Sequence, residues 1–171
     1  MLPARRVRHN SVPLNAFDTR VDKVYTVGCF DLFHNGHIVL LHRMKALGKQ
    51  VIVGVHDSRS IYRLKKRVPI DSTEKRMLNV KKYADMVYCV AGTDPTSYIH
   101  CILTDNPKER CMYVRGDDMK DFPARPLCEA RMVIKFLPYT DGVSSTKRRN
   151  SEFSSCNYGP HAKDDVHAMF Y

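Results

Sequence analysis

The segment that decides the fold is Val27-Gly28-Cys29-Phe30-Asp31-Leu32-Phe33-His34-Asn35-Gly36-His37, in which an apolar strand runs through a turn into a helix start. His34 and His37 stand three residues apart at that start, so both side chains project from nearly the same helix face. Gly36 between them leaves room for a ligand against the backbone, where unpaired amides and the helix dipole favour negative charge. The segment therefore predicts a site for nucleotide phosphates.

A zinc site is the first alternative for the two histidines, because histidines at this spacing are able to share a metal ion. No nearby Cys, Asp or Glu completes a ligand set, and Asp31 alone is not enough. A turn or capping role is the other interpretation of Asp31. The phosphate interpretation also accounts for the glycine and for the passage from strand to helix, neither of which a metal pair requires. We therefore predict no metal held by the protein itself.

The rest of the chain alternates apolar strands with helices. Apolar runs predict strands over 24–29, 51–55, 86–90, 111–114 and 132–137. Helix patterns or starts stand at 36–47, which Gly48 ends, and at 71–74 and 94–96. This alternation predicts an α/β fold: one Rossmann-like domain, with a parallel five-stranded sheet flanked by helices. The ligand crevice is then expected at the C-terminal ends of the strands.

Composition divides the chain into three parts. Residues 1–22 carry four arginines and two prolines and predict a basic N-terminal extension. Residues 23–149 form the predicted nucleotide-binding domain, and residues 150–171 form a polar tail rich in Ser, Asn, Gly and His. At 171 residues and 43% hydrophobic content, the chain suits one packed domain.

Cysteine usage and hydropathy bear on the compartment. The six cysteines are scattered without any C-x-x-C pair, and the N-terminus carries no secretory apolar segment. Reduced thiols in a cytoplasmic protein are therefore expected. No apolar run approaches the length that crosses a bilayer, so no membrane span is expected.

The formal net charge of +10 fits either a nucleic acid or a small polyanion as ligand. The basic residues cluster at 5–8, 63–67 and 147–149, and no basic stripe is interleaved with aromatic residues. This distribution disfavours a nucleic-acid partner. A solvated surface remains the alternative interpretation of each cluster.

The opening motif, Gly28 to His37, resembles the first signature of the HxGH nucleotidylyltransferases, in particular their cytidylyltransferase branch. Val53-Gly54-Val55-His56-Asp57 resembles the second strand and following loop of the members that act on ethanolamine phosphate. Arg115-Gly116-Asp117-Asp118 resembles the segment after the fourth strand. Tyr139-Thr140-Asp141-Gly142-Val143-Ser144-Ser145-Thr146 resembles the RTxGxST signature of the CTP-using enzymes. The resemblance covers roughly residues 23–149.

The resemblance implies that the phosphate of a small phosphorylated alcohol attacks the α-phosphorus of CTP in line and displaces pyrophosphate. It implies catalytic roles for His34, His37, Arg63 and Lys65. It implies contacts with the nucleotide from Cys29, Phe30, Asp31, Gly36, Gly116, Asp117, Thr140, Gly142, Ser144, Ser145 and Thr146. It places the phospho-alcohol at His56, Asp57, Arg76 and Lys82, and a surface role is the alternative for the last two.

The same resemblance implies Mg²⁺ and a homodimer. Mg²⁺ is expected to travel with CTP, held largely by the phosphate oxygens. Among the acceptors we expect phosphoethanolamine first, then glycerol 3-phosphate or phosphocholine. Choline would require an aromatic cage, and without any Trp only Tyr and Phe are able to build one.

Two positions depart from the family's pattern. Arg63-Leu64-Lys65 stands where the family has a K-x-K pair, so arginine keeps the charge but changes its shape and reach. Tyr139 stands where the last signature has an arginine, and a phenol does not replace that cation. Two alternatives to a cytidylyltransferase therefore stay open: a catalytically weakened nucleotide-binding or regulatory module, and an adenylyltransferase that uses ATP.

Overall fold

The computed structural model describes residues 19–103, 108–117 and 120–138. Their strands are β1 (Val21–Gly28), β2 (Gly48–His56), β3 (Met86–Val90), β4 (Cys111–Gly116) and β5 (Val133–Leu137). Their helices are α1 (Asn35–Leu47), α2 (Ser58–Lys65), α3 (Thr73–Lys81), α4 (Thr96–Ile102) and α5 (Arg125–Arg131).

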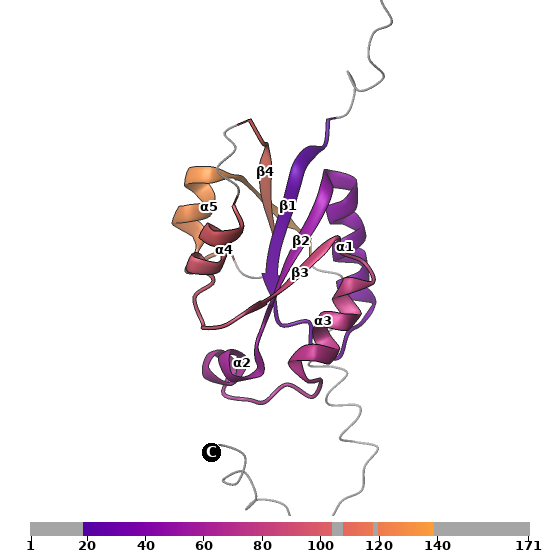
Figure 1. Cartoon of the computed structure of the whole chain (residues 1–171), viewed down its shortest axis with the longest axis vertical. Coiled ribbons are helices and arrows are strands. Elements are labelled where there is room, and N and C mark those ends of the chain that lie inside the picture. Colours follow the sequence, from indigo (N-terminus) through magenta and orange to yellow (C-terminus); the bar gives the residue numbers. More distant parts are fainter. Residues whose placement is uncertain (1–18, 104–107, 118–119, 139–171) are drawn as a thin grey trace, which may run out of the picture.

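The described strands form one parallel sheet in the order β3-β2-β1-β4-β5. The order reverses beside β1, because β2 and β3 follow on one side and β4 and β5 on the other. In Figure 1, α1 and α3 lie on one face of the sheet and α4 and α5 on the other. This is the predicted Rossmann-like fold, and its switch point lies between β1 and β4, where such sheets bind ligands.

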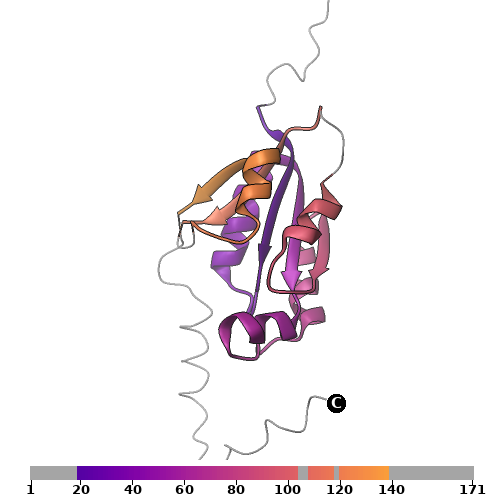
Figure 2. The same cartoon turned by 90° about the vertical axis from the view of Figure 1, so that its left-hand side faces the viewer.

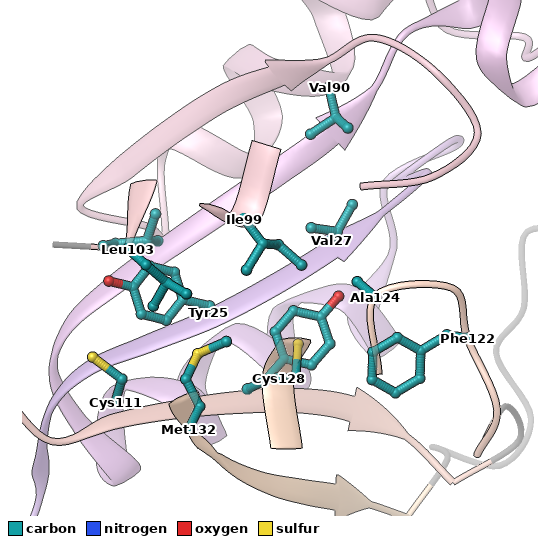
Figure 3. Close-up of a cluster of buried hydrophobic side chains, with 12 residues drawn as sticks. Tyr25, Val27, Val90, Ile99, Leu103, Cys111, Phe122, Ala124, Cys128 and Met132 are labelled. Atoms are coloured by element: carbon teal, nitrogen blue, oxygen red, sulfur yellow. The ribbon is translucent and has the colours of Figure 1, made fainter. Parts of the chain in front are cut away.

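Two cores hold the layers together. Leu41 and Met44 of α1 and Val80 of α3 pack on one face of the sheet, and all three are fully buried. On the other face, shown in Figure 3, α4 and α5 contribute Ile99 and Cys128 to a core around Tyr25 and Tyr113. Burying a large apolar side chain is worth about 1.5–3 kcal/mol, so both faces resist displacement of the strand ends that carry the site.

Gly48 follows the last residue of α1, as predicted, and its amide donates to the Met44 carbonyl. Its φ of −141° is extended backbone, so the glycine is not needed there for a left-handed conformation. A Cβ at this position would collide with the side chain of Val24. Gly48 is therefore required for the close approach of β2 to β1, where it pairs with Val21.

Two described helices were not predicted from the sequence. Helix α2 begins after Asp57 and ends at Lys65, so it includes the first three residues of the basic cluster at 63–67. The short helix α5 precedes β5. Both Figure 1 and Figure 2 show α2 beyond the C-terminal ends of the strands, at the edge where the crevice was predicted.

Candidate active site

The turn between β1 and α1 has an unusual backbone. Phe30 and Leu32 adopt positive φ values of 55° and 48°, which non-glycine residues rarely do. Each left-handed residue costs about 1–2 kcal/mol. Both side chains are buried, so their packing offsets that cost and fixes the path of the turn. The turn delivers His34 to the N-cap position, directly before α1.

His34 and His37 cap the start of α1 reciprocally. Nδ1 of His34 accepts a hydrogen bond from the Gly36 amide at 3.1 Å, and Nδ1 of His37 accepts one from the His34 amide at 3.3 Å. A nitrogen that accepts carries no proton, so each neutral ring carries its proton on Nε2. The two rings stack with centroids 3.9 Å apart. The pair therefore presents neighbouring Nε2–H groups, which suit the oxygens of a phosphate.

This geometry revises how a phosphate would be bound. The amide of Gly36 was predicted to face a phosphate, but it donates to His34. The amides of His37 and Ile38 donate to the carbonyl of His34. The amides of Gly36, His37 and Ile38 are therefore all engaged within the first turn.

Asp31 and Arg76 tie the turn to the neighbouring elements. Asp31 is buried, and its Oδ1 accepts from the Asp71 amide at 2.9 Å, which gives Asp31 the turn role that was its alternative interpretation. Arg76 is fully buried at the start of α3. Its five N–H groups all donate to protein oxygens, the carbonyls of Cys29, His56 and Asp71 and the hydroxyls of Ser58 and Thr73.

The Arg76 bonds correct its predicted role. A side chain with five engaged donors has none left for a substrate, so Arg76 positions the site instead of binding the phospho-alcohol. It joins the last residue of β2 to the residue after β1, since the carbonyls of Cys29 and His56 accept from the same Nη1 at 2.8 and 2.7 Å. All five acceptors are neutral oxygens, so the buried guanidinium brings positive charge to the strand ends.

His56 is the last residue of β2 and is 9% exposed. Its Nδ1 lies 3.1 Å from the carbonyl of Gly92. Burial lowers the pKa of His56 from its ordinary value of 6.5, and the Gly92 carbonyl and Asp57 oppose that shift only in part. His56 is therefore neutral at pH 7.

Asp57 caps α2, because its Oδ1 accepts from the Ser60 amide. Its own amide donates to the carbonyl of Val90 at 3.1 Å. Asp57 thus fixes the start of α2 against β3. Its predicted contact with a substrate stays a proposal.

Arg63 and Lys65 lie on α2 and are exposed. Residues two apart on a helix do not face the same way, so the two cations cannot both point at one phosphate. Lys65 contributes to the lowered pKa of His56, whereas Arg63 is absent from its causes. Of the two, Lys65 is therefore the cation whose charge acts on His56.

The remaining predicted residues divide into three groups. Gly116 ends β4, and the exposed Asp117 donates its amide to the Leu137 carbonyl at 3.0 Å, so both lie at the C-terminal end of β4 beside β5. Lys82 follows the far end of α3, roughly 13 Å along the helix from Thr73, and donates to Asn79 at 3.3 Å. Its predicted contact with the substrate stays a proposal. Tyr139, Thr140, Gly142, Ser144, Ser145 and Thr146 lie outside the described residues.

Arg115 is a residue that sequence reasoning did not single out. It lies on β4 beside Gly116, and its guanidinium stands 4.6 Å from the centre of the Phe122 ring. Its charge also helps to lower the pKa of His56. Strand alternation places Arg115 on the same face as Tyr113, which the sequence pattern already implied.

No group of three or more His, Cys, Asp or Glu in the described residues is arranged to hold a metal ion. In the same described ranges, none of the helices is long and apolar enough to cross a membrane.

The fold and the site together define a Rossmann-like α/β domain with paired histidines after β1. The chain belongs to the cytidylyltransferase-like family, which it matches over residues 25–157. This confirms the predicted family of nucleotidyltransferases.

Curated relatives include the bifunctional protein HldE of Shewanella amazonensis, 35% identical over 132 residues, and that of Chromohalobacter salexigens, 33% identical over 129 residues. Each match covers 72% of this chain. The chain spans only 26% of the length of each relative. A solved lipopolysaccharide core biosynthesis protein from Thermoplasma volcanium superposes with a TM-score of 0.55 at 22% identity, over 70% of this chain and 97% of the other. That structure supports the fold alone. The curated relatives are named HldE, and that name does not mention ethanolamine phosphate. The predicted acceptor therefore stays a proposal.

Proposed function

We propose that this domain transfers the cytidylyl group of CTP to the phosphate of a small phosphorylated alcohol and releases pyrophosphate. Phosphoethanolamine is the first acceptor, ahead of glycerol 3-phosphate and phosphocholine. The observation that carries the proposal is the reciprocal cap of His34 and His37 after β1, in which Nδ1 of each ring accepts from a backbone amide and the two rings stack. Two adjacent neutral donors fit an α-phosphate that gains charge during the reaction.

The reaction requires no nucleophile from the protein. An oxygen of the acceptor phosphate forms a bond to the α-phosphorus, while the bond from that phosphorus to the bridging oxygen breaks and pyrophosphate leaves. His34 and His37 donate to the α-phosphate oxygens, and removal of one such donor typically costs 10²–10³ in turnover, about 2.7–4 kcal/mol. The buried charge of Arg76 and the exposed charge of Lys65 add positive potential.

Mg²⁺ enters with CTP, bound to its phosphate oxygens. The choice of CTP rests on the resemblance of residues 139–146, which the structure does not describe, and ATP is the alternative nucleotide. Tyr139 replaces an arginine of the signature in that segment, so a catalytically weakened nucleotide-binding module is a second alternative. The proposal includes a homodimer, which rests on the family resemblance alone.

The experiment incubates the purified protein with CTP or ATP, Mg²⁺ and phosphoethanolamine, and follows both pyrophosphate and the CDP-alcohol. The proposal predicts that both products appear together with CTP. Product formation with ATP alone would instead establish an adenylyltransferase. Binding of CTP in calorimetry without any product would support the weakened module.

A further inference from the structure

The ring of His56 is oriented oppositely to the rings of His34 and His37. Its Nδ1 faces the carbonyl of Gly92, and a carbonyl oxygen only accepts hydrogen bonds. Nδ1 therefore carries the proton, and in the neutral ring Nε2 keeps an unprotonated lone pair. The strand ends thus combine two histidines that donate through Nε2 with one that accepts through it.

Nε2 of His56 is accessible. Among the described residues, the contact with Gly92 is the hydrogen bond of this side chain. The buried side-chain nitrogens and oxygens without a partner in those residues are the hydroxyls of Tyr25, Tyr98 and Tyr113, and Nε2 of His56 is not one of them. The small exposed part of the ring therefore includes its accepting nitrogen.

The acceptor is held rigidly from both sides. The His56 carbonyl accepts from Arg76 at 2.7 Å, which fixes the backbone below the ring. Gly92, which accepts from the ring, donates its own amide to Ser60 Oγ at 2.7 Å. Ser60 is buried in the first turn of α2, so the ring cannot turn over without breaking the contacts of α2. A preorganised acceptor binds a ligand without paying to order itself.

The charges around His56 define which ligand suits it. Asp57 is the negative group beside it, and Arg115 and Lys65 are the positive ones. A zwitterionic ligand, which carries both a phosphate and a hydrogen-bond donor, matches charges of both signs around a neutral acceptor.

We propose that Nε2 of His56 accepts a hydrogen bond from the ammonium or hydroxyl group of the phospho-alcohol, and so selects acceptors that carry an N–H or O–H donor over those with a quaternary ammonium. This inference rests on the proposed cytidylyl transfer. A site built to bind a donor rejects the analogue that lacks it, because the acceptor is then left unpaired.

The test is a series of acceptors: phosphoethanolamine and its mono-, di- and trimethylated forms. The dimethylated form keeps one N–H and the trimethylated form has none, while both carry the same charge. We expect kcat/KM to fall by about tenfold or more at the last methylation, and by much less at each earlier one. In His56→Phe, which keeps a ring but removes the acceptor, this last step should disappear.

Two results overturn the inference in different ways. If transfer occurs but kcat/KM declines evenly along the series, or if His56→Phe keeps the last step, the size of the ligand decides and His56 is not the acceptor. If no acceptor in the series yields a CDP-alcohol, the proposed function itself fails and the inference fails with it. Thermal unfolding of His56→Phe with and without CTP, compared with the wild type, checks that the variant is folded and binds nucleotide.

Discussion

The ends of β1 and β2 both carry histidines that the backbone holds through Nδ1, yet they offer opposite groups to a ligand. After β1, the backbone partners of Nδ1 are amides, so His34 and His37 present Nε2–H donors. At the end of β2 the partner is the Gly92 carbonyl, so His56 presents an acceptor. The same residue type therefore serves a phosphate at one strand end and a donor group at the next, and the backbone atom behind the ring decides which.

Arg76 joins the two strand ends, so its removal is expected to have the largest effect. Arg76→Met leaves the buried carbonyls of Cys29 and His56 without their donor. We expect a loss of about 3 kcal/mol or more in the free energy of unfolding, together with loss of activity. Urea unfolding measures this loss. Arg59→Met, an exposed arginine on α2, is the control and should change stability by less than about 0.5 kcal/mol. Equal stability of the two variants would show that Arg76 does not hold the strand ends together.

His37→Ala removes one of the two imidazole donors after β1 and leaves His56 unchanged. We expect kcat to fall about a hundredfold, because one positioned donor to the α-phosphate is lost. Stability should fall by only about 1 kcal/mol, the worth of one capping bond. His42→Ala, on an exposed position of the same helix, is the matched control and should keep its turnover. Near-normal kcat in His37→Ala would assign the histidine pair to helix capping alone.

Variants of Lys65 and Arg63 test which cation of α2 acts on the ligand near the end of β2. The charge of Lys65 acts on His56, whereas Arg63, two residues earlier on α2, lies on a different face of the helix. Lys65→Ala should raise KM for the phospho-alcohol by about five- to tenfold, and Arg63→Ala by less than about twofold, as expected for partly screened charges. Steady-state kinetics on both variants decides this. The reverse ranking would mean that arginine has taken over the role of the family's first lysine.

The smallest expected effect is on the pH dependence of stability. Burial lowers the pKa of His56 in the folded protein from 6.5, so the unfolded chain binds this proton first as the pH falls. The contribution of His56 to stability is therefore present above about pH 6.5 and is lost below it. Urea unfolding at pH 7.5 and 5.5 should show a smaller loss for His56→Phe than for the wild type. An identical loss in both proteins would contradict a buried neutral His56.

The sequence predicted the sheet because the evidence for each strand is local. Val51 to Val55 is almost all valine and isoleucine, and the structure buries all of it in β2. The paired histidines were predictable for the same reason, since their spacing and the preceding strand lie within one short segment. The residues from Val27 to His37 were enough to predict them.

The missed features depend on contacts between distant residues. Helix α2 was not predicted, because only Ser60 and Ile61 of its residues are buried and its charged residues resemble a loop. The role of Arg76 requires the carbonyl of Cys29, 47 residues away. The tautomer of His56 is set by Gly92, 36 residues further along the chain. Local patterns carry no information about such partners.

The most direct test of this account is the protonation of the three histidine rings in solution. NMR spectra that correlate the ring nitrogens with the ring protons, recorded at pH 7.5 on labelled protein and assigned with His34→Gln, His37→Gln and His56→Phe, identify the tautomer of each ring. The account predicts a proton on Nε2 of His34 and His37 and on Nδ1 of His56. A His56 ring protonated on Nε2, like the other two, would contradict the division of the site into donors and an acceptor.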